Sequence, residues 1–247
     1  MINEYAQVTL FLGAALSTGV ASISAGFGEG QTAAVTTKAI MRQPGARDIM
    51  LRSMLISQAV TESGAIFALV ISLLLLFGGF LDESVDLAKA FSFLAAGMAM
   101  GFGSMGPNFG SGFAGSNACD AIGRTPSQHI PVTTNMLIGQ ALSQTSAIFA
   151  LVVSLLLLYT VPNMAENQEI LHQVVKACAY FGAAFAIGFG TLGPGSGIGF
   201  IAGKTCQMIA RYKEKQSYFM RTMFLGAAVS ESTAIYSLVV AFLLIFM

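Results

Sequence analysis

The chain has 247 residues, of which 55% are hydrophobic and 10% are charged, with a formal net charge of zero and a mean hydropathy of +0.72. Soluble domains carry about 25% charged residues, so this composition excludes an ordinary soluble domain and predicts an all-α membrane protein. Nothing in the charge balance indicates a nucleic-acid partner.

Six apolar segments follow one another along the chain. A transmembrane helix needs about 20 mainly apolar residues, and lipid excludes open strands because every backbone polar group must be bonded internally. The expected spans are residues 8–41, 52–80, 87–122, 132–161, 170–210 and 220–247. We therefore predict six transmembrane helices, arranged as three tandem helical hairpins at residues 1–82, 83–165 and 166–247.

The two helices of each hairpin differ in composition. The first, third and fifth spans are rich in glycine, whereas the second, fourth and sixth are rich in Leu, Ile, Val and Phe. Small residues allow helix backbones to approach closely in membranes. The odd spans are therefore predicted to form a closely packed layer, and the even spans a layer that faces lipid.

Basic residues gather at the three turns that join the helices of each hairpin. The two lysines elsewhere are Lys89 and Lys176. Because cytoplasmic loops carry an excess of Lys and Arg, this pattern predicts cytoplasmic turns and external termini. The basic residues near the turns are Lys38, Arg42, Arg47, Arg52, Arg124, Lys204, Arg211, Lys213, Lys215 and Arg221.

An internal repeat fixes the register of the three hairpins. Each has an arginine at its turn and a polar residue 20 positions later, inside the apolar run: Arg42 and Glu62, Arg124 and Gln144, Arg211 and Glu231. A carboxylate inside a membrane is costly and is a functional-site hypothesis by default. Glu62 and Glu231 are thus candidate ion-binding residues, and Gln144 marks a hairpin without the carboxylate.

The same register predicts what lies opposite these residues. Thirteen positions before the three turn arginines stand Glu29, Ser111 and Ile198. Glu29 and Glu62 should therefore lie close together and hold one proton or one cation between them, because like charges that close cannot both ionise cheaply. The alternative is that Glu29 only fills a polar gap among glycines.

Oxygen-bearing groups surround both membrane carboxylates. Hydroxyl and carbonyl oxygens are hard ligands that suit a small cation better than a bare proton, and a tyrosine hydroxyl could orient a carboxylate. The alternative for the hydroxyls is ordinary hydrogen bonding between helices. The groups in question are Val60 and Ser63 near Glu62, and Val229, Ser232, Thr233 and Tyr236 near Glu231.

Together, the hairpins, the glycines, the Arg42-Gln43-Pro44 turn and the membrane glutamates resemble the c subunit (proteolipid) of rotary F-type and V-type ATP synthases. The chain is similar to an unusual triple-hairpin form with sodium-type features. The resemblance implies a non-catalytic rotor-ring subunit without a cofactor. It further implies that Na⁺, or H⁺, is carried on Glu62, Glu29 and Glu231.

The resemblance also implies partners and a location. These are membrane lipid, further copies of the chain in a ring, the stator a subunit, and central-stalk subunits that contact Arg42, Gln43 and Pro44. The expected location is a bacterial or archaeal plasma membrane. The second and third turns depart from the Arg-Gln-Pro pattern, so stalk contact is expected at the first turn. A missing carboxylate is typical of V-type rotors, which makes an ATP-driven ion pump the alternative.

Two other readings fit less well. A secondary transporter or channel usually has inverted or broken repeats that line a cavity, whereas these three repeats run in one orientation. The GxGxxG matches at residues 101–106 and 188–193 are also typical of dinucleotide binding, but that motif needs a preceding strand. Both matches lie inside apolar spans, which favours helix packing.

Overall fold

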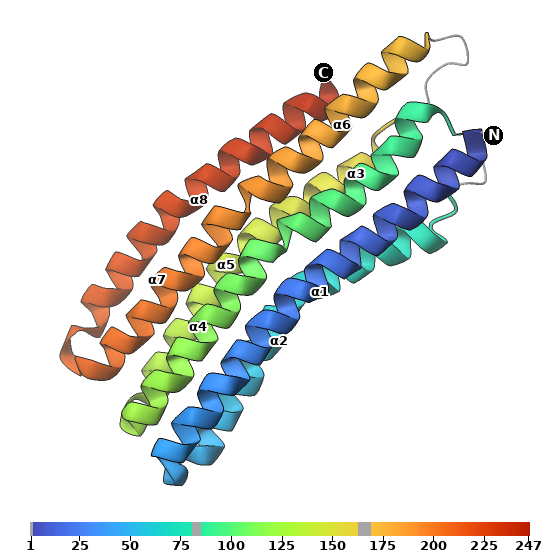
Figure 1. Ribbon diagram of the computed structural model, residues 1–247. Coiled ribbons are helices and arrows are strands. Elements are labelled where there is room, and N and C mark those ends of the chain that lie inside the picture. Colours follow the sequence, from blue (N-terminus) through green and yellow to red (C-terminus); the bar gives the residue numbers. More distant parts are fainter. Residues whose placement is uncertain (1, 81–84, 163–168) are drawn as a thin grey trace.

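The computed structural model describes residues 2–80, 85–162 and 169–247, and within these ranges the regular structure is entirely helical (Figure 1). Six stretches are long and apolar enough to cross a membrane, which confirms the predicted all-α fold. The helices are α1 (Ile2–Arg42), α2 (Arg47–Phe77), α3 (Leu87–Gly103), α4 (Met105–Arg124), α5 (His129–Tyr159), α6 (Ile170–Gly190), α7 (Leu192–Arg211) and α8 (Gln216–Phe246).

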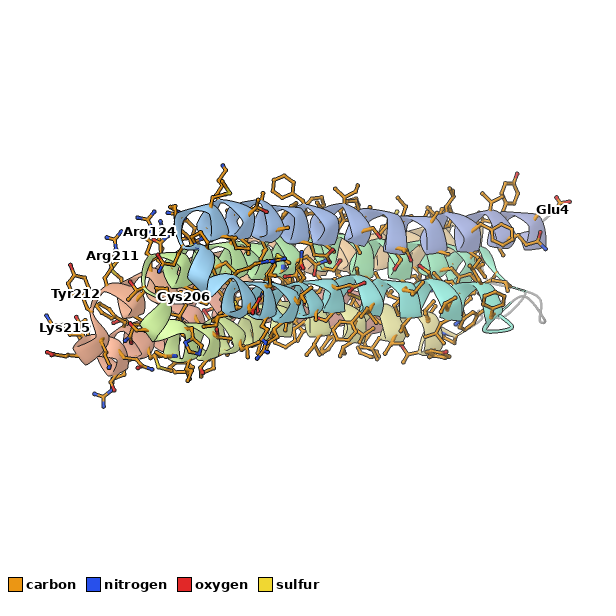
Figure 2. All side chains as sticks on the ribbon, turned by 90° about the horizontal axis from the view of Figure 1, so that it is seen from below. Glu4, Arg124, Cys206, Arg211, Tyr212 and Lys215 are labelled. Atoms are coloured by element: carbon orange, nitrogen blue, oxygen red, sulfur yellow. The ribbon has the colours of Figure 1, made fainter. Side chains whose placement is uncertain are left out.

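We name the pair α1 and α2 hairpin 1, the group α3 to α5 hairpin 2, and the group α6 to α8 hairpin 3. The predicted hairpin boundaries, after residues 82 and 165, lie outside the described residues. Figure 1 shows both chain termini at one end of the bundle and the hairpin turns at the other. In Figure 2, Arg124, Arg211 and Lys215 accordingly lie at the opposite end from Glu4.

Each hairpin turn is short and built in the same way. One residue leaves the helical conformation, with φ near −139°, −140° and −130° for Gln43, Thr125 and Tyr212, and a single 3₁₀ turn follows. The second helix of each hairpin then starts at once. These helices begin several residues before the predicted spans, because the residues that follow the turns, from Arg47, His129 and Gln216 onward, are already helical.

The first helical arm of hairpins 2 and 3 is interrupted, at Ser104 and Thr191. The cause in hairpin 2 is Pro107, which has no N–H to donate to the carbonyl of Gly103 four residues earlier. That carbonyl instead accepts a 3.0 Å hydrogen bond from the Thr191 hydroxyl of hairpin 3. Pro194 has the same relation to the second break. Helix α1 has alanine at this position and is continuous.

The helices form two layers, with hairpin 2 between hairpins 1 and 3 (Figure 1). The glycine-rich arms pack closely on one another, as predicted. A Cβ at Gly112 would clash with the backbone of Gly28, and a Cβ at Gly199 would clash with that of Gly110. Large apolar side chains of α2, α5 and α8 are exposed, among them Leu69, Leu73, Ile148, Val152, Val239 and Leu243.

Candidate sites between the hairpins

The interface between hairpins 2 and 3 holds Glu231. Its Oε1 accepts a 2.6 Å hydrogen bond from Thr145 Oγ1 of α5, and the same hydroxyl lies 2.7 Å from the Leu142 carbonyl oxygen. A carboxylate, a hydroxyl and a carbonyl oxygen therefore meet in mid-helix, from two hairpins. Such an oxygen cluster can bind a small cation, or a proton on the carboxylate.

Thr145 was not among the sequence-predicted site residues. The signal was present, because Thr145 follows Gln144 in the way that Ser63 follows Glu62 and Ser232 follows Glu231. What the sequence did not reveal is that this hydroxyl serves the carboxylate of the next hairpin.

The interface between hairpins 1 and 2 holds Gln144, which is only 6% exposed. Its Nε2 donates hydrogen bonds to Ser111 Oγ at 3.1 Å and to the Val60 carbonyl at 3.3 Å, and lies 3.5 Å from Asn108 Oδ1. The contact with Ser111 agrees with the predicted register. The sequence reading missed Asn108, whose only signal was that it replaces a glycine: the equivalent residue of hairpin 3 is Gly195.

Hairpin 1 carries the pair Glu29 and Glu62, whose carboxylates repel one another electrostatically. Glu29 is held by its backbone carbonyl, which accepts a 3.2 Å hydrogen bond from Gln58 Nε2. Gln140 makes the equivalent bond, of 2.8 Å, to the Ser111 carbonyl. Glu62 is exposed, and among the described residues no hydrogen-bond donor from hairpin 2 reaches either carboxylate.

Among the described residues, the remaining predicted ligands make no hydrogen bond to the glutamate of their own hairpin. Three hydroxyls donate instead to carbonyls of their own helices: Ser63 to Val60 at 2.7 Å, Ser232 to Val229 at 2.7 Å, and Thr233 to Ser230 at 2.8 Å. Tyr236 is 66% exposed and makes no hydrogen bond to Glu231 within the described chain. Ile198, in the third hairpin, is completely buried.

The predicted stalk-contact residues Arg42, Gln43 and Pro44 are all exposed at the turn of hairpin 1. Arg42 forms an ion pair with Asp120 of hairpin 2, and Asp120 also accepts a 2.9 Å bond from Arg124 Nε. Asp120, another residue that the sequence reading missed, thereby ties the first turn to the second.

These features define a membrane protein of tandem helical hairpins, with an amide or a carboxylate midway along the helices at each of the two interfaces between hairpins. Comparison with known families gives the particular one. The family model that describes the ATP synthase c subunit matches residues 12–75, 94–157 and 181–244, one match in each hairpin. The chain belongs to the ATP synthase c subunit family. It is a non-catalytic rotor component of the ATP synthase complex and not an enzyme on its own.

The similar proteins align with this chain over a length close to that of one hairpin. The ATP synthase c subunit of Mesomycoplasma hyopneumoniae strain 7448 is 47% identical over 72 residues, which is 29% of this chain and 70% of the relative. That of Dehalococcoides mccartyi strain BAV1 is 44% identical over 72 residues, or 29% of this chain and 95% of the relative. That of Alkaliphilus oremlandii is 46% identical over 74 residues, or 30% and 83%.

Proposed function

We propose that this chain is the ion-carrying rotor subunit of a rotary ATP synthase, and that it carries Na⁺ on Glu231 and on Glu62 together with Glu29. The observation that carries the proposal is the contact of Thr145 with Glu231 across the interface between hairpins 2 and 3. A hydroxyl and the Leu142 carbonyl beside this carboxylate supply more oxygen ligands than a proton needs. The alternative is that the same carboxylates carry H⁺.

Ion binding also solves the problem of carrying a charge through lipid. A buried ionised carboxylate without a partner is strongly unfavourable. A glutamate with a bound cation or proton has no net charge and can face lipid while the rotor turns. At the stator a subunit the ion is exchanged, and the potential contributes about 2.3 kcal/mol per charge per 100 mV.

The way in which the interfaces repeat supports assembly of several chains into a ring. Gln144 contacts the hairpin before it, and so does Glu231, whereas Glu62 is exposed and has no such contact among the described residues. Hairpin 3 exposes the corresponding partner surface: Val229, the equivalent of Val60, is 73% exposed, and Ser232, the equivalent of Thr145, is partly exposed. We infer that hairpin 3 of one copy completes the Glu62 site of the next copy.

The glycines support the same assembly. Gly30 occupies the same position in the repeat as Gly112 and Gly199, each of which packs closely against the backbone of the preceding hairpin. A Cβ at Gly30 would meet nothing within 4 Å in this chain. A glycine is required there if the Gly197 region of another copy packs on it, as Gly28 packs on Gly112.

The proposed orientation, location and partners rest on the family and on the basic residues at the hairpin turns. The turns face the cytoplasm of a bacterial or archaeal cell, where Arg42, Gln43 and Pro44 contact the central stalk, and the helices face lipid and the stator a subunit. The replacement of one carboxylate by Gln144 lowers the number of ions per turn. This favours ATP-driven ion pumping over synthesis at low ion-motive force, as in V-type rotors.

Labelling of the intact complex with a hydrophobic carbodiimide tests the proposal. We expect modification of Glu62 and Glu231, and protection of both by Na⁺ at constant pH. Glu214, an exposed acid in the third turn, is the control that Na⁺ should not affect. Protection by raised pH alone would assign H⁺ as the carried ion, and modification of neither membrane glutamate would contradict the assignment of the sites.

A further inference from the structure

The amide of Gln144 lies where a backbone carbonyl of hairpin 1 and two side chains of hairpin 2 present oxygen acceptors. Ser111 Oγ, the Val60 carbonyl oxygen and Asn108 Oδ1 all lie between 3.1 and 3.5 Å from the single atom Nε2. Ser111 and Asn108 are completely buried. Three oxygens around one electropositive group form the kind of surrounding that a small cation takes in proteins.

The orientation of this amide follows from its neighbours. A backbone carbonyl can only accept hydrogen bonds, so the group that faces the Val60 carbonyl is the NH₂ of Gln144. Asn108 is oriented in the same way, because its Nδ2 faces the Ala21 carbonyl at 3.4 Å and Ser24 Oγ at 3.1 Å. Its Oδ1 is therefore left to face Gln144.

The oxygen of the Gln144 amide, unlike its nitrogen, makes no hydrogen bond to the described residues. Gln144 Oε1 is buried and has no hydrogen-bond partner among the described residues. Only the donor end of the Gln144 amide is engaged among the described residues, so the oxygens around it meet its electropositive NH₂ group.

From this geometry we infer that the Gln144 amide is a built-in substitute for the carried cation, which keeps the interface between hairpins 1 and 2 permanently filled. The inference rests on the proposed function for the identity of the ion. The NH₂ group donates to Ser111 Oγ and to the Val60 carbonyl and faces Asn108 Oδ1, in the place of a bound ion, but it is covalently attached and cannot be exchanged. The middle hairpin is thus a closed site and not merely one that has lost its carboxylate.

The first test is Gln144→Glu in the full-length chain, purified in its assembled complex. This change removes the donor and places a carboxylate oxygen against three acceptors, so that a cation or proton is required to hold the interface together. We expect the number of carbodiimide-reactive membrane glutamates to rise from two per chain, Glu62 and Glu231, to three, with the introduced carboxylate at position 144 as the third. The introduced carboxylate should be protected by the same ion that protects Glu231.

The second test, Gln144→Met, does not depend on ion carriage. Methionine has a similar length and shape but no donor, so the oxygens of Val60, Ser111 and Asn108 lose their contact with the Gln144 amide. We expect the melting temperature of the assembled ring to fall by about 2–8 °C. Gln128→Met, a change of another side chain that is 6% exposed in the same hairpin, should have a smaller effect.

The outcomes separate the inference from the proposed function. An introduced carboxylate at position 144 that stays unreactive, or that ignores the ion protecting Glu231, overturns the inference. So does a Gln144→Met ring that melts like the wild type. If Glu62 and Glu231 themselves fail to react in the wild type, the proposed function fails, while the melting of the Gln144→Met ring still decides whether the amide fills the interface.

Discussion

Thr145 and Glu231 belong to different hairpins, yet the hydroxyl of the first donates a 2.6 Å hydrogen bond to the carboxylate of the second. The site is therefore a property of an interface and not of a hairpin. Hairpin 3 supplies the carboxylate of Glu231, and hairpin 2 supplies the hydroxyl of Thr145.

Replacing Thr145 by valine should weaken sodium binding at Glu231 alone. Valine keeps the shape of threonine and removes the hydroxyl, and hydrogen bonds to charged groups contribute about 1.5–3 kcal/mol. We expect the sodium concentration that half-protects Glu231 from carbodiimide to rise about tenfold or more. Glu62 provides an internal control in the same molecule, and Thr145→Ser should retain most of the protection. Equal loss at both glutamates would contradict a local role.

Replacing Gly30 by alanine should prevent ring assembly and leave the chain folded. The added methyl group has open space within one chain, but in the proposed ring it meets the backbone of the preceding copy, and overpacking costs about 1–3 kcal/mol at each contact. Native mass spectrometry should find separate chains with unchanged helix content. Gly45→Ala, at a turn where the methyl group also meets nothing within 4 Å, should assemble normally. Intact rings from Gly30→Ala would refute the proposed contact.

Replacing Asp120 by asparagine should loosen the turn end of the interface between hairpins 1 and 2. Asp120 pairs with both Arg42 and Arg124, but both arginines are exposed, so we expect a loss of only about 0.5–1 kcal/mol. The difference in melting temperature from the wild type should shrink at high salt, because salt screens exposed charges. Glu214→Gln serves as a comparison from the third turn. A large loss that salt does not change would indicate packing as the cause.

Sodium titration of purified rings should find two binding sites per chain. Hairpins 1 and 3 supply the carboxylates, and hairpin 2 supplies Gln144. Calorimetry against a chain concentration measured by amino-acid analysis gives the number directly. One site per chain would mean that either Glu62 or Glu231 does not bind sodium. Three sites would mean that Gln144 does not exclude sodium from the interface between hairpins 1 and 2.

The sequence predicted the helices and the register within each hairpin, because both depend on local patterns. Apolar runs of membrane length gave the six segments, and the spacing from the turn arginines placed Ser111 beside Gln144, as the structure confirms. The relation between neighbouring hairpins could not be obtained in this way. It depends on how the glycine-rich arms pack, with Gly112 on Gly28 and Gly199 on Gly110.

The residues that were missed all act across these interfaces. Thr145, Asn108 and Asp120 each contact a side chain of another hairpin. Within its own repeat, Thr145 is only a hydroxyl next to Gln144, and Asn108 only a polar residue among glycines. A tandem repeat shows which positions are equivalent, but it does not show which face of one unit meets the next.

The fixed order of the three hairpins has a consequence for rotation. Around a ring of such chains, Glu231 of one copy is followed directly by Glu62 of the next, whereas Glu62 and Glu231 of the same copy are separated by the hairpin that holds Gln144. Ion exchange at the stator would therefore advance the rotor by one hairpin and then by two, in alternation. Torque would reach the central stalk in unequal strokes, and elastic twisting of the stalk would have to even them out before they reach the catalytic head.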